Sequence, residues 1–477
     1  MRGLPAGRWS PLVAATALCV CVPPEVGADM VERLARLAGF ESFGATLAVQ
    51  VSAGDLAGAV LVAVAAVLVA LRKVAPPPPW TLPAFGSVAL AAGIATLCSQ
   101  DIAASLPGYV RIVQLLVLVP LAAMTLVQDR VDGLVVAAAV VAVALVESVY
   151  GIWQALTRNG AAIGGETVRA VGTFGAADVM ALSIVAGFGL VFALAFAVAG
   201  PPRIRPLAAA ALAVLGSALL LALSRGSWIA IGAAAGLVLL ARSPRLAVRT
   251  AVTGAALVVV AVGGLGVGLG SDDDGGRTLA ARAQSMTSVM DTPDQSVLDR
   301  YSLWTAARGM WGDHPVTGVG VKNFAAYRDA YAPIELSSAG EIEDPAHGYR
   351  RQALLSPHSQ YLLVVAEQGV VGLVALVTLF GTLAWGVWRH RDPRDPLWLA
   401  GYGFLAGLLI NFVYADISGA SSMLVAIMIG LVAAGAATRV RDTSEAVGAH
   451  VQGGPGAAGV RVQDASEAVV GVRGGTA

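Results

Sequence analysis

Residues 133–155 read GLVVAAAVVAVALVESVYGIWQA and contain a single charged side chain, Glu147. An apolar run of about 20 residues is long enough to cross a bilayer as one helix, which makes all its backbone hydrogen bonds internally. Only 13% of the 477 residues are charged, whereas an average soluble domain has about 25%. Because so few charges cannot cover a soluble surface of this size, the composition predicts an all-α, polytopic membrane protein.

Comparable apolar runs recur along the chain, and about twelve of them reach membrane length. The first run could be a signal peptide, because Val26-Gly27-Ala28 resembles a small-residue cleavage site, but a retained first helix is favoured. We expect helices 1–9 within residues 1–270 and helices 10–12 within residues 358–438. The runs lie near 11–28, 53–71, 83–99, 109–127, 133–155, 177–199, 206–223, 227–241, 249–270, 359–386, 397–414 and 419–437.

The short basic connections indicate which side of the membrane each loop faces. With the amino terminus in the cytoplasm, all of them fall inside, as the positive-inside rule requires. The long polar segment 271–357 is then a large extracytoplasmic loop with short helices, placed before the third-last membrane helix. Residues 439–477 are rich in Gly, Ala and Val, and we predict a disordered cytoplasmic tail there. The basic positions are Arg72/Lys73, Arg130, Arg203/Arg205, Arg242/Arg245/Arg249, Arg389/Arg391/Arg394 and Arg439/Arg441.

Arg225 stands between two apolar runs with almost no loop around it. A cation at that depth is costly unless it is paired or faces a polar cavity, so it indicates a functional site. A side chain that merely extends to the lipid headgroups is the alternative, weighed lower because the flanking runs form a tight outer hairpin. Within the runs, Glu147 and Glu367 are the main ionisable residues, which disfavours an ion-coupled transporter.

The second half of the outer loop has a helical pattern. Arg300, Trp304, Arg308 and Trp311 fall on one face of a helix, and tryptophan with arginine on one face is typical of a helix at a membrane surface. The turn after it contains His314, Pro315 and two glycines, and Asn323 opens what could be a second short helix. The charged segment 335–352 is expected to be mobile.

Four short motifs follow one another between residues 169 and 372. The motifs, their order and the long outer loop before the last motif resemble those of the O-antigen ligase and O-antigen polymerase family of bacterial envelope glycosyltransferases. Ala176-Ala177-Asp178 and Ser359 depart from the asparagines that are common in that family at these places. The motifs are Arg169-Ala-Val-Gly172-Thr173-Phe174, Ser224-Arg225-Gly226-Ser227-Trp228, Arg300-x3-Trp304 with His314-Pro315-x2-Gly318-x-Gly320-x2-Asn323-Phe324-x2-Tyr327, and His358-Ser359-x-Tyr361-Leu362-x4-Glu367-x-Gly369-x2-Gly372.

The resemblance implies a multi-pass protein of the bacterial cytoplasmic (inner) membrane. Its members transfer a glycan from an undecaprenyl-diphosphate carrier to a saccharide or lipid-core acceptor on the outer face, with membrane lipids and no nucleic acid as partners. The carrier diphosphate already activates the donor, so no ATP and no cofactor are expected. The sequence has no Walker loop, zinc-ligand pair or convincing Asp-x-Asp signal, and we predict a metal-independent, inverting enzyme.

Arginine offers a permanent charge with fork geometry, which suits a departing diphosphate. We therefore assign Arg225 and Arg300 to catalysis, with His358 as general base because its ordinary pKa lies near neutrality. A histidine that only caps its helix or is solvated is the alternative. His314 and Glu367 also have structural interpretations, the first ordering its turn and the second joining helices. The candidate substrate-binding residues are Arg169, Trp304, Arg308, His314, Asn323, Tyr361 and Glu367.

Several functions stay open at this point. A ligase, a polymerase and a protein O-oligosaccharyltransferase of the same family differ only in the acceptor, which one sequence does not reveal. A lipid-glycan or solute transporter of about twelve helices would show ionisable residues at mid-membrane and internal symmetry, of which there is little. A non-catalytic envelope assembly factor would leave Arg225 and His358 without a role.

Overall fold

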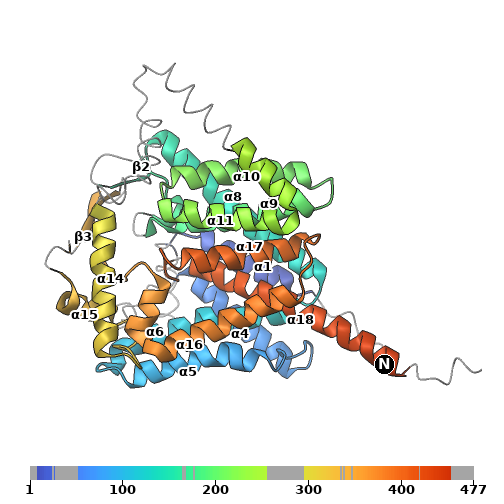
Figure 1. The fold of residues 1–477 in the computed structure, drawn as a ribbon, viewed down its shortest axis with the longest axis horizontal. Helices are drawn as coiled ribbons and strands as arrows, with labels where there is room; N and C mark the ends of the chain where they lie inside the picture. Colours follow the sequence, from blue (N-terminus) through green and yellow to red (C-terminus); the bar gives the residue numbers. More distant parts are fainter. Residues whose placement is uncertain are drawn as a thin grey trace, which may run out of the picture.

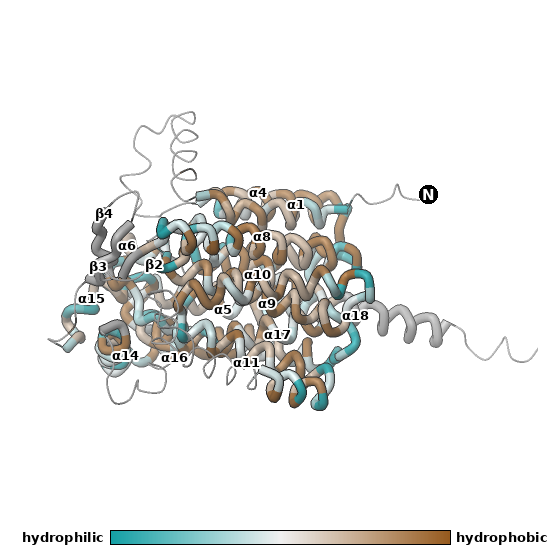
Figure 2. Tube along the Cα trace, turned by 90° about the horizontal axis from the view of Figure 1, so that it is seen from above, coloured by the Kyte–Doolittle hydropathy of each residue, from teal (hydrophilic) through white to brown (hydrophobic). Residues whose placement is uncertain are grey.

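The computed structural model describes residues 8–23, 52–163, 168–175, 178–254, 295–333, 339–344, 348–417 and 421–452, with the single positions 26, 336 and 419. The apolar helices lie side by side in one bundle, and α14, α15 and the strands lie together at one end of it (Figure 1). The tube view shows the same separation, with hydrophobic residues along the bundle and hydrophilic ones at its ends (Figure 2). The elements that carry the predicted motifs are therefore collected at a single end.

Six helices of the described part are long and apolar enough to span a membrane, and shorter apolar helices accompany them. The helical membrane class is thereby confirmed, and each predicted run except 249–270 falls on one of these helices. That run lies largely outside the described residues, so the count of twelve stays a prediction. The α-helices are α1 (Ser10–Leu18), α4 (Ala53–Ala70), α5 (Thr81–Leu97), α6 (Ile102–Val113), α7 (Val119–Leu126), α8 (Arg130–Thr157), α9 (Ala181–Ala199), α10 (Arg205–Leu221), α11 (Arg225–Arg242), α14 (Gln295–Asp313), α15 (Phe324–Tyr331), α16 (Gln360–Arg389), α17 (Pro396–Asn411) and α18 (Ser422–Gln452). Two short 3-10 helices, η1 (Cys19–Cys21) and η3 (Gly172–Phe174), and one π-helix, η2 (Gln114–Leu118), lie between them.

Aspartates begin several of these helices. The side chains of Asp101, Asp129 and Asp395 each accept a hydrogen bond from a backbone N–H in the first turn of α6, α8 and α17. Such caps satisfy donors that have no partner inside the helix. The helices then pack through small residues, as at Gly189 of α9, where an added Cβ would lie 2.2 Å from the Cβ of Ala144 on α8. Close backbone approach replaces the hydrophobic driving force that lipid does not supply.

A small antiparallel sheet joins two distant loops at the same end of the bundle. Its strands are β1 (Ala161–Ile163), β2 (Val168–Arg169), β3 (Ala339–Asp344) and β4 (Gly348–Ala353), in the order β2-β1-β3-β4. These strands were not predicted from the sequence, whose charged 335–352 segment was expected to be mobile. At the other end of the chain, α18 continues to Gln452, past the predicted boundary at 438, and residues 453–477 lie outside the described part.

Helix α16 is broken at Gly369, whose φ of 62° and ψ of −154° are not helical. The turn between α14 and α15 fills this break: the N–H groups of Val370 and Val371 donate to the carbonyls of Pro315 and Val316, at 2.9 and 3.2 Å. In the reverse direction, Val319 N–H donates to the Ala366 carbonyl at 2.9 Å. Because a break at membrane depth must find backbone partners within the protein, the turn stabilises α16 and fixes α14 against it.

Candidate functional site

His358 lies two residues before α16, in the left-handed region with φ 49°. Its backbone N–H donates to the hydroxyl of Ser356 at 3.2 Å, and its side chain is half-buried. Burial, and next the positive charge of Arg300, hold the pKa of His358 below its ordinary value, while the nearby Asp416 acts in the opposite direction. The imidazole is therefore disposed to be neutral, which is the form that can accept a proton.

Helix α14 brings Arg300 and Trp304 to this histidine. Trp304 donates its indole N–H to the carbonyl of Pro357, at 3.0 Å. One turn earlier, Arg300 donates to the carbonyl of Tyr414 at 3.2 Å, and its guanidinium carbon lies 5.6 Å from the centre of the Tyr414 ring. An adjacent face of α14 is buried, with Leu303 and Met310 fully covered. The helix is thus anchored by apolar packing and presents its arginine and tryptophan to the site.

Tyr414 and Asp416 belong to the segment 412–421 that follows α17, and residues 412–417 of it are held against the start of α16. The N–H of Gln360 donates to the carbonyls of Phe412 and Ala415, at 2.9 and 3.1 Å. The Gln360 side chain in turn accepts from the N–H of Ile417 at 2.8 Å. As a result Tyr414 and Asp416 are placed next to the histidine that lies two positions before Gln360.

The start of α11, of which Arg225 is the first residue, lies at the same place. A Cβ added to the adjacent Gly226 would lie 3.0 Å from the Cβ of Tyr414, so the backbone of the Ser-Arg-Gly motif abuts that tyrosine. Ser224 is 5% exposed, and its hydroxyl is 2.9 Å from that of Ser227. Tyr414 thus lies between the start of α11 and the Arg300 side chain.

Arg169, on the edge strand β2, completes the arrangement. Its side chain is 7% exposed and lies 3.7 Å from the sulfur of Met180, which is also 3.7 Å from the Ser224 hydroxyl. The side chain of Met180 therefore separates Arg169 from the Ser-Arg-Gly motif.

Glu147 and Gln154 on α8 hold Gly172 and Thr173, which belong to the motif that begins at Arg169. Thr173 donates both its N–H and its hydroxyl to the Glu147 carboxylate, at 2.8 and 2.7 Å. Gln154 accepts from the N–H of Gly172 at 2.8 Å and donates to its carbonyl at 3.0 Å. The buried Glu147 carboxylate thus serves to dock this loop.

The other predicted substrate-binding residues lie apart from this group. Asn323 is 3% exposed and donates to Ser99 at 2.7 Å, and Glu367, 5% exposed, accepts from the N–H of Phe324 at 3.1 Å. The Tyr361 hydroxyl donates to the Leu409 carbonyl at 2.8 Å. These contacts connect elements of the fold. His314 directly follows α14, and its carbonyl accepts from the N–H of Gly318 in the turn, while Arg308 is exposed on α14.

Two residues of the site, Tyr414 and Asp416, were missed as site residues by sequence reasoning. They stand outside the four motifs, and the only signal was an aspartate at an outer helix end. Among the described residues, no cluster of three or more His, Cys, Asp or Glu side chains is arranged to hold a metal ion.

The fold and the site together define a polytopic helical membrane protein with arginines and a histidine gathered at one end of its bundle. Residues 208–377 match the family model described as O-Antigen ligase, which supports the resemblance to that family. Its members are glycosyltransferase-like enzymes of membranes. The matched region includes Arg225, Arg300 and His358, whereas Arg169 and Tyr414 lie outside it. No curated protein matches the chain.

Proposed function

We propose that the protein transfers a glycan from an undecaprenyl-diphosphate carrier to an acceptor hydroxyl on the outer face of the bacterial inner membrane, as an O-antigen ligase. The observation that carries this proposal is the position of Tyr414, which abuts the backbone of Gly226 next to Arg225 and accepts a hydrogen bond from Arg300, the cation that also acts on His358. Such a group of cations beside a neutral base is what transfer from a lipid diphosphate requires.

In the proposed reaction, the acceptor oxygen attacks the anomeric carbon of the donor sugar from the side opposite the diphosphate. The new carbon–oxygen bond forms as the bond to the diphosphate breaks, which inverts the anomeric centre. The hydroxyl proton passes to His358. Negative charge grows on the departing diphosphate, and Arg225 and Arg300 stabilise it, with Arg169 as a third cation behind them. In this proposal the arginines supply the charge, and no metal ion takes part.

The aromatic side chains beside the cations support a sugar substrate. Tyr301 and Tyr414 are 45% and 37% exposed, and the ring of Trp304 lies between theirs, 5.7 and 6.2 Å away. Aromatic rings with exposed faces are rigid and amphipathic, so they provide apolar contact to a sugar ring and keep a polar atom available. Trp304 would hold the sugar nearest to His358.

The direct test is transfer of a lipid-linked glycan by purified variants. His358→Ala and Arg225→Ala should each abolish most turnover, and near-normal turnover by both would overturn the assignment. His390→Gln is the matched control, because His390 follows the opposite end of the same helix. In cells, deletion of the gene followed by glycan analysis separates the rivals. Full-length carrier-linked polymer would accumulate without a ligase, single repeat units without a polymerase, and cytoplasmic-side intermediates without a transporter.

A further inference from the structure

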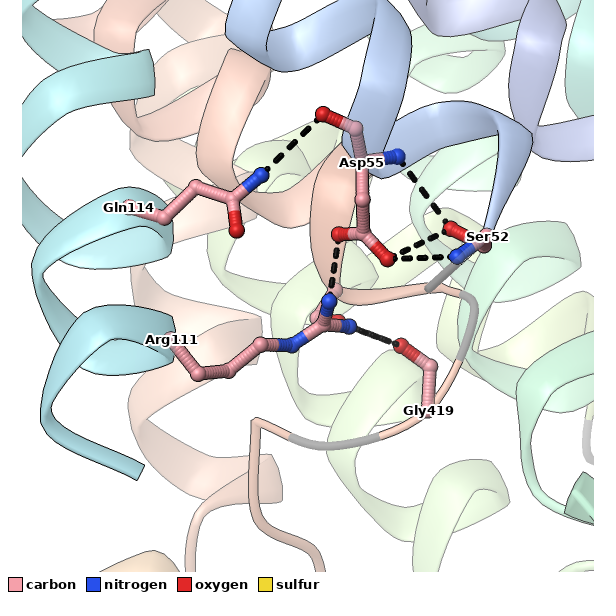
Figure 3. Close-up of polar contacts among 6 residues, drawn as sticks. Ser52, Asp55, Arg111, Gln114 and Gly419 are labelled. Carbon is pink, nitrogen blue, oxygen red and sulfur yellow. Dashed lines mark hydrogen bonds and ion pairs between the residues drawn. The ribbon is translucent and has the colours of Figure 1, made fainter. Parts of the chain in front are cut away.

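Arg111, on α6, is tied to two other elements at the site end of the bundle. One terminal nitrogen makes an ion pair with the carboxylate of Asp55 on α4. The other lies 3.4 Å from the carbonyl of Gly419, in the connection between α17 and α18 (Figure 3), and 3.3 Å from the hydroxyl of Ser422, the first residue of α18. One guanidinium thus joins α4, α6 and this connection.

The carboxylate that faces Arg111 is itself fixed. Asp55 is 5% exposed, and its second oxygen accepts from both the N–H and the hydroxyl of Ser52, each at 2.8 Å. Gln114 donates to the Asp55 carbonyl at 3.2 Å (Figure 3). Asp55 therefore gives one oxygen to the start of its own helix and keeps the other for Arg111.

The connection that Arg111 holds is the one that carries Tyr414 and Asp416. Its first half is bonded to Gln360, as described above, and its second half reaches Arg111 at Gly419. Gly419 has a φ of 72°, and a Cβ there would lie 1.9 Å from the Asp178 carboxylate, so its backbone is closely confined on that side as well. Tyr414 and Asp416 precede this second anchor.

We propose that Arg111 is a positioning residue for the transfer reaction: with Asp55 behind it, it fixes the second half of the 412–421 segment and thereby sets Tyr414 and Asp416 against Arg300 and His358. The proposal rests on the proposed function for its catalytic consequence. Its structural part, the immobilisation of the segment, holds independently of which substrate is used.

Arginine is required in this role because three acceptors must be reached at once. Its planar fork can face a carboxylate with one nitrogen and a carbonyl and a hydroxyl with the other, whereas lysine is a point charge on a flexible stem. Arg111→Lys should therefore keep the pairing with Asp55 and lose the contacts to Gly419 and Ser422.

A second ion pair offers a matched control. Arg130 of α8 lies 2.9 Å from Asp395, which is buried at the start of α17. Both pairs join an arginine to a buried aspartate in the capping region of a helix. The Arg130 pair lies at the start of α17, whereas Arg111 contacts the connection that follows the end of α17. Loss of the Arg130 pair should destabilise the fold comparably but leave the segment after α17 in place.

The experiment is hydrogen–deuterium exchange of the purified full-length protein, followed in peptides that cover 412–425. In Arg111→Gln and Arg111→Lys, the amides of Ile417 and Ser422 should exchange about tenfold faster, while those of α16 stay protected. Ser422→Ala removes one contact without leaving a buried charge, and it should give a smaller increase in a protein of unchanged melting temperature. Wild-type exchange in both Arg111→Lys and Ser422→Ala, or an equal increase in Arg130→Gln, would overturn the proposal.

Transfer kinetics then test the catalytic part. A displaced segment should lower kcat about tenfold with little change in KM, because groups that act at the reacting centre move while the rest of the substrate contacts remain. Faster exchange with unchanged kcat would overturn the positioning role. If wild-type protein transfers no glycan, the proposed function fails, and the exchange result still decides whether Arg111 immobilises the segment.

Discussion

The indole N–H of Trp304 and the carbonyl of Pro357 are joined by a hydrogen bond of 3.0 Å, and Pro357 is the residue directly before His358. This bond connects the helix of the large outer loop to the start of the next membrane helix. It ties the predicted base to the surface that carries Arg300. The orientation of His358 therefore depends on α14 as well as on its own chain neighbours.

Trp304→Ala should lower kcat/KM by about 10- to 100-fold, because it removes both this bond and a ring beside the reacting centre. Trp304→Phe keeps an aromatic ring and should retain more activity. Trp311, 38% exposed near the end of the same helix, is the control. Transfer assays of the three variants check the prediction, and an equal loss in Trp311→Ala would indicate a general effect of α14.

His358 should titrate below its ordinary pKa of about 6.5. Since it acts as a base in its neutral form, the acid limb of kcat/KM should have its midpoint below that pH. Asp416→Asn removes the charge that raises the pKa, so the midpoint should move lower still. NMR of labelled histidine measures the same pKa without turnover, and the signal missing in His358→Gln assigns it. A midpoint above 6.5, or an upward move in Asp416→Asn, would contradict the assignment.

Replacement of either central arginine by lysine should be costly. Arg225→Lys and Arg300→Lys keep the charge and lose the fork, so we expect a loss in kcat on the order of 100-fold with a smaller change in KM. Arg249→Lys, at an exposed position, should stay within about twofold. Steady-state kinetics with a lipid-linked donor measure this. If the lysine variants retain full kcat, charge alone suffices and bidentate recognition is wrong.

Gly369→Ala should destabilise the protein by more than about 2 kcal/mol, through overpacking and a φ of 62° that alanine adopts poorly. Its Cβ would lie 2.3 Å from the backbone of Val316 in the inserted turn. Gly381 lies in the same helix, and a Cβ there meets nothing within 4 Å, so Gly381→Ala should be neutral or slightly stabilising. Thermal unfolding in detergent measures both. Similar melting temperatures would show that the break in α16 does not depend on this turn.

Sequence reasoning singled out the arginines and the histidine as a group because each stands within a recognisable motif, and their roles stay predictions. It assigned Asn323 and Glu367 to substrate binding, whereas their side chains connect the turn between α14 and α15 to neighbouring helices. A spacing in sequence shows that a polar residue is needed at a place. It does not show whether the partner is a ligand or the backbone of another element.

The strands and the residues after α17 could not be predicted for a different reason. β1 and β2 are three and two residues long, too short for an alternating pattern to appear. Tyr414 and Asp416 stand in a short connection without a motif of their own. Their importance comes from the contacts of Tyr414 with Gly226 and Arg300 and from the bonds of their neighbours to Gln360, all of which are distant in the chain.

The sequence by itself determined that the protein is a helical membrane protein, because apolar length decides which segments can cross a bilayer. It also indicated which ends of the helices carry the chemistry. Only the tertiary structure decided how those ends meet: the break in α16 is filled by the turn between α14 and α15, and Tyr414 lies between Gly226 and Arg300. The physical reason is that bilayer insertion depends on local composition, whereas the site is assembled from hydrogen bonds and packing between segments that hydropathy does not relate.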